Sequence, residues 1–206
     1  MSYDNALVAA KLRRWEKYLK EYSLPLWEEI PNFGLYMEQV LVLLKEYLDY
    51  LPPELKDEQL ITAAAINNYV RNKYMPEPQK KRYYRVHIAY LVMICTLKRS
   101  LSIATLQKMI PVGIEEEQVR EIYTAYVRRH KHSANFFITQ IRQIAGPILQ
   151  HENDVNNEVA TSETEELIEA AAILSGLSGL LAEKLLLLEG QRLKSTEDSF
   201  RLPENS

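Results

Sequence analysis

Basic side chains are concentrated in one short part of the chain. Residues 67–99 contain eight lysines and arginines against one acidic residue, Glu77, so the segment has a net charge of +7. The other 173 residues sum to −10, although the whole chain of 206 residues is only −3. Because phosphate binding depends on the local field, this block predicts a polyanion-binding surface. A solvated charged face is the plain alternative.

Amide and guanidinium side chains occupy one face of a helix predicted over residues 63–73, with the hydroxyl of Thr62 as its N-cap. At 100° per residue, Ile66 and Val70 share the packing face, and Tyr69 flanks them. The opposite arc carries small and polar residues: Ala64, Asn67, Asn68 and Arg71. Since asparagine can read adenine and arginine can read guanine in the major groove, we expect this face to contact base edges.

Residues 77–85 are predicted to form an extended or hairpin element, a basic wing, because two prolines in three residues disfavour a helix. Lys73 is the last residue of the predicted helix and precedes this wing. The wing carries four cations and two aromatic residues, namely Lys80, Lys81, Arg82, Tyr83, Tyr84 and Arg85. Their cations and hydroxyls suit phosphate contacts. Because side chains alternate along a strand, we expect one of the two tyrosines to be anchored in the core.

Other chemistry finds little support in the sequence. The four histidines are scattered, and His130 and His132 lack the i, i+4 spacing of a two-histidine metal site. The single cysteine, Cys95, lies within the apolar row IAYLVMICTL and is expected to be an inert core thiol. No glycine-rich phosphate loop or nucleophile motif occurs. We therefore expect neither an enzyme nor a metal or other cofactor.

The elements that must position the basic residues are mostly helical, because glycine is scarce and apolar residues recur every three or four positions. Strands should be few and short. The predicted helices cover residues 4–22, 35–51, 63–73, 85–100, 103–110, 115–130 and 134–150. Asn32 and Ser102 are expected N-caps, LPLWEEIP is expected to be an apolar strap across the core, and Gly146-Pro147 is expected to kink the last helix.

The C-terminal third differs in composition. Residues 151–164 are predicted to be an acidic linker, residues 165–190 a helix serving as core or dimer element, and residues 191–206 a mobile tail. The apolar run 170–188 is interrupted by a Glu-Lys pair, which disfavours a membrane span. The N-terminus lacks the pattern of a signal peptide, so a cytoplasmic location is expected.

Two stretches carry a family resemblance. The segment ITAAAINNYVRNKYMPEPQKKRYYRVHIAYLVMICTLKRSLSIATLQKMI resembles the winged helix-turn-helix of MerR-type bacterial transcription regulators. In addition, LPLWEEIPNFGLYMEQV together with AINNYVRNKYMPEP is similar to an uncharacterised bacterial family considered related to those regulators. The resemblance implies a mainly α fold with a MerR-like core and extra N- and C-terminal helices. It places the DNA-binding domain in residues 1–111 and a helical extension in residues 112–150.

The resemblance also assigns roles residue by residue. Thr62 corresponds to the cap of the recognition helix, Asn67 stands where these regulators usually carry an arginine, and Asn68 replaces the first of two following aromatics. Tyr69 keeps the second aromatic. The usual glycine of the turn before Thr62 is absent, and the loop after residue 51 is longer than usual.

Two functions therefore stand as hypotheses. In the first, the protein is a homodimeric regulator that binds double-stranded DNA through helix 63–73 and wing 77–85, dimerising through residues 115–150 or 165–190. In the second, it is a helical interaction module that keeps the fold without binding DNA and docks an acidic partner on residues 71–85. Contact of the C-terminal helix with a membrane is a weaker third, and any small-molecule effector stays undetermined.

Overall fold

The computed structural model describes residues 5–48, 61–98 and 100–146, together with 171, 174, 175 and 178. The helices are α1 (Asn5–Glu21), the 3₁₀ turn η1 (Trp27–Glu29), α2 (Met37–Tyr47), α3 (Ala63–Arg71), α4 (Arg85–Leu97), α5 (Ile103–Met109) and α6 (Glu116–Ile144). Within these ranges, extended pairing is limited to the isolated bridges Leu35–Tyr83 and Gln79–Arg82. The predicted mainly helical fold is therefore confirmed.

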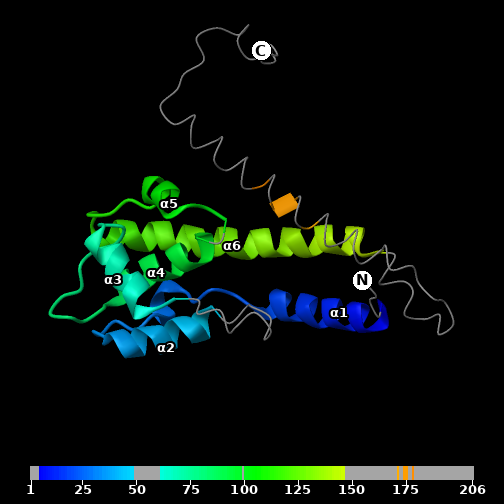
Figure 1. The fold of residues 1–206 in the computed structure, drawn as a ribbon, viewed down its shortest axis with the longest axis horizontal. Coiled ribbons are helices and arrows are strands. Elements are labelled where there is room, and N and C mark those ends of the chain that lie inside the picture. Colours follow the sequence, from blue (N-terminus) through cyan, green and yellow to red (C-terminus); the bar gives the residue numbers. More distant parts are fainter. Residues whose placement is uncertain are drawn as a thin grey trace, which may run out of the picture.

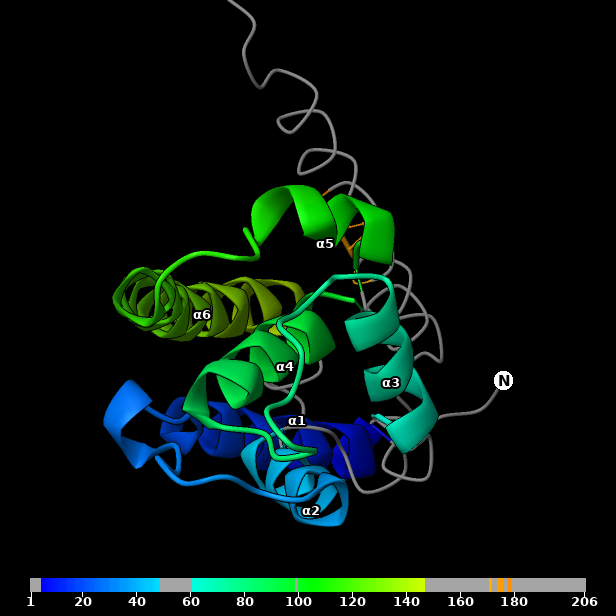
Figure 2. The ribbon, with the colours of Figure 1, turned by 90° about the vertical axis from the view of Figure 1, so that its left-hand side faces the viewer.

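Helix α4 is the centre of the core. Its residues from His87 to Cys95 are all buried, as expected for a helix that is apolar on every side. Figure 2 shows α4 in the middle, with α3 and α6 on either side, α2 below and α5 above. Because α4 begins directly after the predicted wing, the wing is attached to the most buried element of the fold.

The strap and the first half of α6 close the core from the other side. Leu24, Trp27 and Ile30 are buried, which confirms the apolar strap, whereas Leu26 is exposed. The hydroxyl of the fully buried Tyr123 on α6 donates a hydrogen bond of 2.8 Å to the carbonyl oxygen of Pro25. The core therefore continues past residue 111 into α6.

The two helical stretches predicted at 115–130 and 134–150 are one continuous helix, α6, of 29 residues. Its second half runs beside α1, so that these two helices extend to the right of the core in Figure 1. The Lys131 ammonium group donates to the carbonyl oxygens of Lys20 and Tyr22 at the end of α1. A cation at this position stabilises a helix C-terminus, and it holds α1 to α6.

Several helix boundaries differ from the sequence prediction, and α4 ends at Leu97 rather than residue 100. Asn32 is not the cap of α2; the helix starts at Met37 after Tyr36, whose backbone N–H donates to Gln39 Oε1 at 2.9 Å. The start is delayed because Leu35 is held in a backbone pair with Tyr83. Helix α3 ends at Arg71 rather than residue 73. Ser102 caps α5 as predicted, accepting from the Thr105 N–H at 3.1 Å.

Several predictions fall outside the described residues: the end of helix 35–51, the kink at Pro147, the acidic linker 151–164, most of helix 165–190 and the tail 191–206. Within the part that is described, no helix is both long and apolar enough to cross a bilayer.

The Tyr123 hydroxyl should contribute measurably to stability. Replacing Tyr123 with Phe leaves the buried Pro25 carbonyl without its donor, which should lower the free energy of unfolding by about 1–2 kcal/mol. Urea denaturation would measure this loss. The control is Tyr74→Phe, because the Tyr74 hydroxyl makes no hydrogen bond among the described residues. Equal stability of the two variants would contradict the assignment.

The same residue predicts a loss of stability in alkali. Burial raises the pKa of Tyr123 above its ordinary value of 10.0. Its contribution is therefore complete below pH 10 and decreases as pH rises further, because the unfolded chain then releases the proton more readily than the folded one. Thermal unfolding between pH 9 and 11 should show a shallower decrease for Tyr123→Phe than for the wild type. Parallel curves would exclude this contribution.

Candidate nucleic-acid interface

Helix α3 exposes the polar face that its sequence predicts. The Thr62 hydroxyl accepts a hydrogen bond of 3.1 Å from the Ala65 N–H, confirming the N-cap. Ile66 is fully buried, whereas Asn67 and Arg71 are exposed and Asn68 is half-buried. The helix is therefore fixed by one face, and the other is available to a ligand.

A hydrogen-bond network joins three polar side chains at the end of α3. The carboxamide oxygen of Asn68 accepts from Arg71 Nη2 at 2.7 Å and from Asn72 Nδ2 at 2.8 Å. The Asn67 amide makes no side-chain hydrogen bond with any other described residue. The Asn67 carboxamide can therefore still donate and accept hydrogen bonds, whereas the oxygen of Asn68 is already used twice.

Helix α3 ends in a Schellman motif that carries a lysine where glycine is usual. The Tyr74 N–H donates to the Tyr69 carbonyl at 2.8 Å, and the Lys73 N–H donates to the Val70 carbonyl at 3.0 Å. Lys73 has a φ of 57°, in the left-handed region. Its side chain is exposed, directly after the polar face of α3.

The predicted wing contains a short β-hairpin with a two-residue turn. The Arg82 N–H donates to the Gln79 carbonyl at 2.9 Å, and the Gln79 N–H donates to Arg82 at 3.1 Å. Lys80 and Lys81 form the turn with φ values of 49° and 63°, as in type I′, where Asn-Gly is preferred. Among the described residues, the non-glycine positions with positive φ are these two lysines and Lys73.

The base of the hairpin is held against the loop before α2. Leu35 and Tyr83 exchange two backbone hydrogen bonds of 2.8 Å. The Arg82 guanidinium lies 4.5 Å from the Tyr36 ring centroid and donates to the Tyr36 hydroxyl at 2.8 Å. A Cβ on Gly34 would come within 2.9 Å of the Arg82 side chain, so glycine is needed for this close approach. Arg82 therefore anchors the hairpin, although it is exposed.

Some residues predicted to contact DNA instead belong to the scaffold. The rings of Tyr69 and Tyr83 are only 8% and 4% exposed, and burial raises the pKa of both hydroxyls, which corrects their assignment as surface contacts. Tyr83 is thus the expected core anchor. Tyr84 is half-buried at the N-cap of α4. Arg85 donates to the Ile30 carbonyl at 2.8 Å and lies 5.7 Å from the Trp27 ring centroid, so it ties α4 to the strap.

Six of the predicted contact residues are exposed. Apart from Arg82, which anchors the hairpin, they form a set that we call the basic surface: Asn67, Arg71, Lys73, Lys80 and Lys81. All five lie on α3 or on the chain that joins it to α4, at the left-hand end of Figure 1, away from the free ends of α1 and α6.

His87 was not predicted to matter, yet it organises the wing. It is 3% exposed, and its Nδ1 accepts from the Tyr84 N–H at 2.9 Å. The proton must therefore be on Nε2, which donates to the Glu77 carbonyl at 3.0 Å. His87 thus joins both ends of the segment that contains Lys80 and Lys81. A histidine three residues after a helix N-cap is the only signal in the sequence, and it is a weak one.

Other titratable groups have structural roles. Cys95 is buried, and this raises the pKa of its thiol to about 12, which suits a core residue rather than a nucleophile. Burial lowers the pKa of His130. Among the described residues, no group of three or more His, Cys, Asp or Glu side chains is placed to hold a metal ion.

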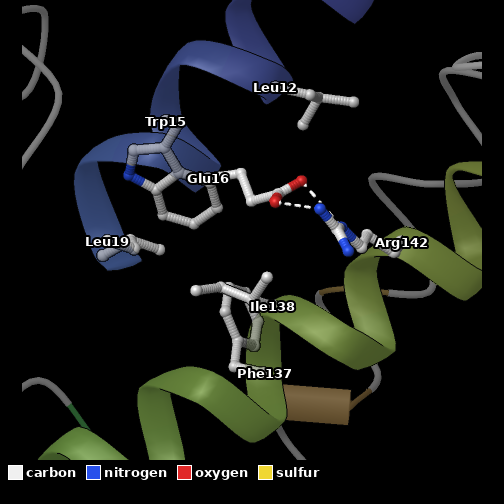
Figure 3. Close-up of a pocket in the computed structure, with 7 residues that line it drawn as sticks. All are labelled: Leu12, Trp15, Glu16, Leu19, Phe137, Ile138 and Arg142. Carbon is white, nitrogen blue, oxygen red and sulfur yellow. Dashed lines mark hydrogen bonds and ion pairs between the residues drawn. The ribbon is translucent and has the colours of Figure 1, made fainter. Parts of the chain in front are cut away.

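A small apolar hollow lies between α1 and α6. Figure 3 shows Trp15, Leu12 and Leu19 of α1 facing Phe137 and Ile138 of α6 across it. At its edge, the Arg142 guanidinium donates to both oxygens of the Glu16 carboxylate, and this pairing lowers the pKa of Glu16. A carboxylate paired in this way holds the two helices together and is not available as a general base.

Comparison with known proteins defines the class of this chain. It belongs to a family characterised by a domain of unknown function, DUF1836, whose profile matches residues 25–128. The matched region contains the strap, α2 to α5, the core half of α6 and all of the basic surface. No curated protein and no solved structure matches the chain.

Removing the His87 hydrogen bonds should loosen the hairpin. His87→Leu leaves the Tyr84 N–H and Glu77 carbonyl unpaired and should cost about 1–3 kcal/mol of stability. His87→Gln, whose amide can both accept and donate, should lose less. Denaturation would measure stability, and hydrogen exchange at the Gln79 and Arg82 amides would report on the hairpin. If the Leu variant protects these amides as well as wild type, His87 does not position the wing.

Proposed function

We propose that this protein is a DNA-binding transcription regulator of MerR-like type that acts as a cytoplasmic homodimer. In this proposal α3 enters the major groove of double-stranded DNA, and the hairpin between α3 and α4 contacts phosphates. The chain order of α2, α3, a two-residue hairpin, α4 and α5 agrees with such a winged helix-turn-helix.

The observation that carries the proposal is that the described non-glycine residues with a left-handed backbone conformation are Lys73, Lys80 and Lys81. Holding an L-residue other than glycine in this region costs about 1–2 kcal/mol, and asparagine or glycine would suit all three positions better. Each position instead holds an exposed lysine. Strain of this kind is typical of functional sites, and here it falls on three exposed lysines, one just after α3 and two in the turn of the hairpin.

The lysines of the basic surface also differ from the arginines around them. Arg82 and Arg85 bond to carbonyl, hydroxyl and aromatic groups of their own chain. The side chains of Lys73, Lys80 and Lys81 make no hydrogen bond or ion pair with any described residue. The first set fixes the scaffold, whereas the second has no internal hydrogen bond or ion pair that an external polyanion would have to displace.

The proposed dimer rests on the second half of α6. Phe136 is 61% exposed there, on a part of the helix that extends beyond the core. The adjacent Phe137 is 39% exposed, and neighbouring exposed aromatic residues are typical of an interface. Sedimentation analysis of wild type and Phe136→Glu tests this part of the proposal separately.

An interaction module without DNA binding is the second candidate. Phe33 and Tyr36 are 62% and 51% exposed, and Tyr36 stacks with Arg82, a combination that protein interfaces favour. Co-purification discriminates between the two functions. A stable acidic partner that is lost when Lys80 and Lys81 are changed to Glu, with no DNA recovered, would favour this candidate.

Charge at the hairpin can be removed without harming the fold. The double substitution Lys80→Asn and Lys81→Gly introduces the preferred type I′ sequence, so stability should rise by about 1 kcal/mol. Affinity for duplex DNA should nevertheless fall at low salt, and the slope of log K against log salt should become shallower by about 2. Fluorescence anisotropy over a salt series would measure both changes.

The matched control removes two exposed charges from α1, by Arg14→Gln and Lys17→Gln. It should leave the salt slope at the wild-type value. The proposed function fails if wild type shows no salt-dependent binding to duplex DNA, or if the hairpin and α1 variants lose affinity equally.

A further inference from the structure

The polar face of α3 contains three side chains whose types can hydrogen-bond to base edges: Asn67, Asn68 and Arg71. The hydrogen bonds at this face leave them with different numbers of free donors and acceptors. To read adenine in a bidentate manner, an asparagine must accept with its oxygen and donate with its nitrogen. The Asn68 oxygen already accepts from both Arg71 and Asn72. Asn68 would have to give up two hydrogen bonds to read adenine, whereas Asn67 would give up none.

The same network prepares Arg71 for guanine. Its guanidinium carries five N–H donors in one plane, and Asn68 occupies a single one, on Nη2. Whichever of the two Nη2 hydrogens is used, one edge with two parallel donors remains, either Nη1 with Nη2 or Nε with Nη2. Two parallel donors are what the O6 and N7 atoms of guanine require. Anchoring by Asn68 also reduces the rotamer freedom that Arg71 would lose on binding.

Asn67 and Arg71 are four residues apart and therefore lie one above the other on the helix. The rise between them is about 6 Å, against about 3.4 Å for one base pair. The two side chains would thus reach bases separated by no more than about two base pairs.

We infer that α3 reads an adenine through Asn67 and a guanine through Arg71 within about two base pairs of each other, and that Asn68 is a positioning residue for Arg71. This inference rests on the proposed function and adds its specificity. It differs from the expectation that Asn67, Asn68 and Arg71 all contact base edges.

Selection of bound duplexes from random DNA at fixed salt, with the full chain, tests the inference. Wild type should select a half-site containing A and G at this spacing. Asn67→Ala should lose the preference for A alone, and Arg71→Ala the preference for G alone, each by about tenfold. Asn72→Ala is the control, because Arg71 keeps its bond to Asn68 and both preferences should persist.

Asn68 separates positioning from general structural damage. Asn68→Ala should weaken the G preference and leave the A preference intact. Asn68→Asp retains an acceptor for Arg71, so it should restore the G preference even though its negative charge lowers affinity for every sequence. A change in the A preference in Asn68→Ala, or no recovery in Asn68→Asp, would overturn the positioning role.

The wild-type result distinguishes failure of this inference from failure of the proposed function. Salt-dependent binding without the A and G pair would overturn this inference and leave the proposed function standing. Failure to bind any duplex would overturn both.

Discussion

The backbone pair between Leu35 and Tyr83 is the constraint on which the position of the hairpin depends. These two residues are 48 positions apart, and their two hydrogen bonds of 2.8 Å join the loop before α2 to the chain that leaves the hairpin. The buried Tyr83 ring adds apolar area to this joint, and His87 closes the same segment from the α4 side. A hairpin of two turn residues would be marginal in water on its own. Here it is bound to the most buried helix of the molecule.

Arginines and lysines have different roles around the Leu35–Tyr83 pair. The arginines that have delocalised, planar head groups stack on Tyr36 and Trp27 and bond to main-chain oxygens, where their geometry is useful. The lysines, which are compact and strongly hydrated, occupy the turns. A net charge of −3 would by itself discourage binding to DNA, but residues 67–99 sum to +7, and the lysines in the turns of this segment make no hydrogen bond or ion pair with any described residue. The local arrangement is therefore more informative than the total.

Much of this arrangement could be predicted from the sequence, namely the features that depend on a single helix and its own cap. The polar and packing faces of α3, its Thr62 cap, the burial of α4 and the choice of one tyrosine as an anchor all follow from periodicity and local chemistry. Features that depend on distant backbone atoms could not be predicted. The partners of His87 are main-chain groups whose positions exist only after folding, α2 starts late because Leu35 pairs with a remote residue, and lysine in a turn contradicts the usual preference for glycine.

The continuity of α6 has a mechanical consequence. Its first half packs on α4, its second half is clamped to α1 by Lys131 and Arg142, and 29 residues span about 43 Å. An unbroken helix resists bending, since a bend must lengthen or break main-chain hydrogen bonds. The helix therefore connects α1 continuously to the core. A displacement of α1 relative to the core would have to be taken up where α6 packs on α4, the helix that follows the hairpin.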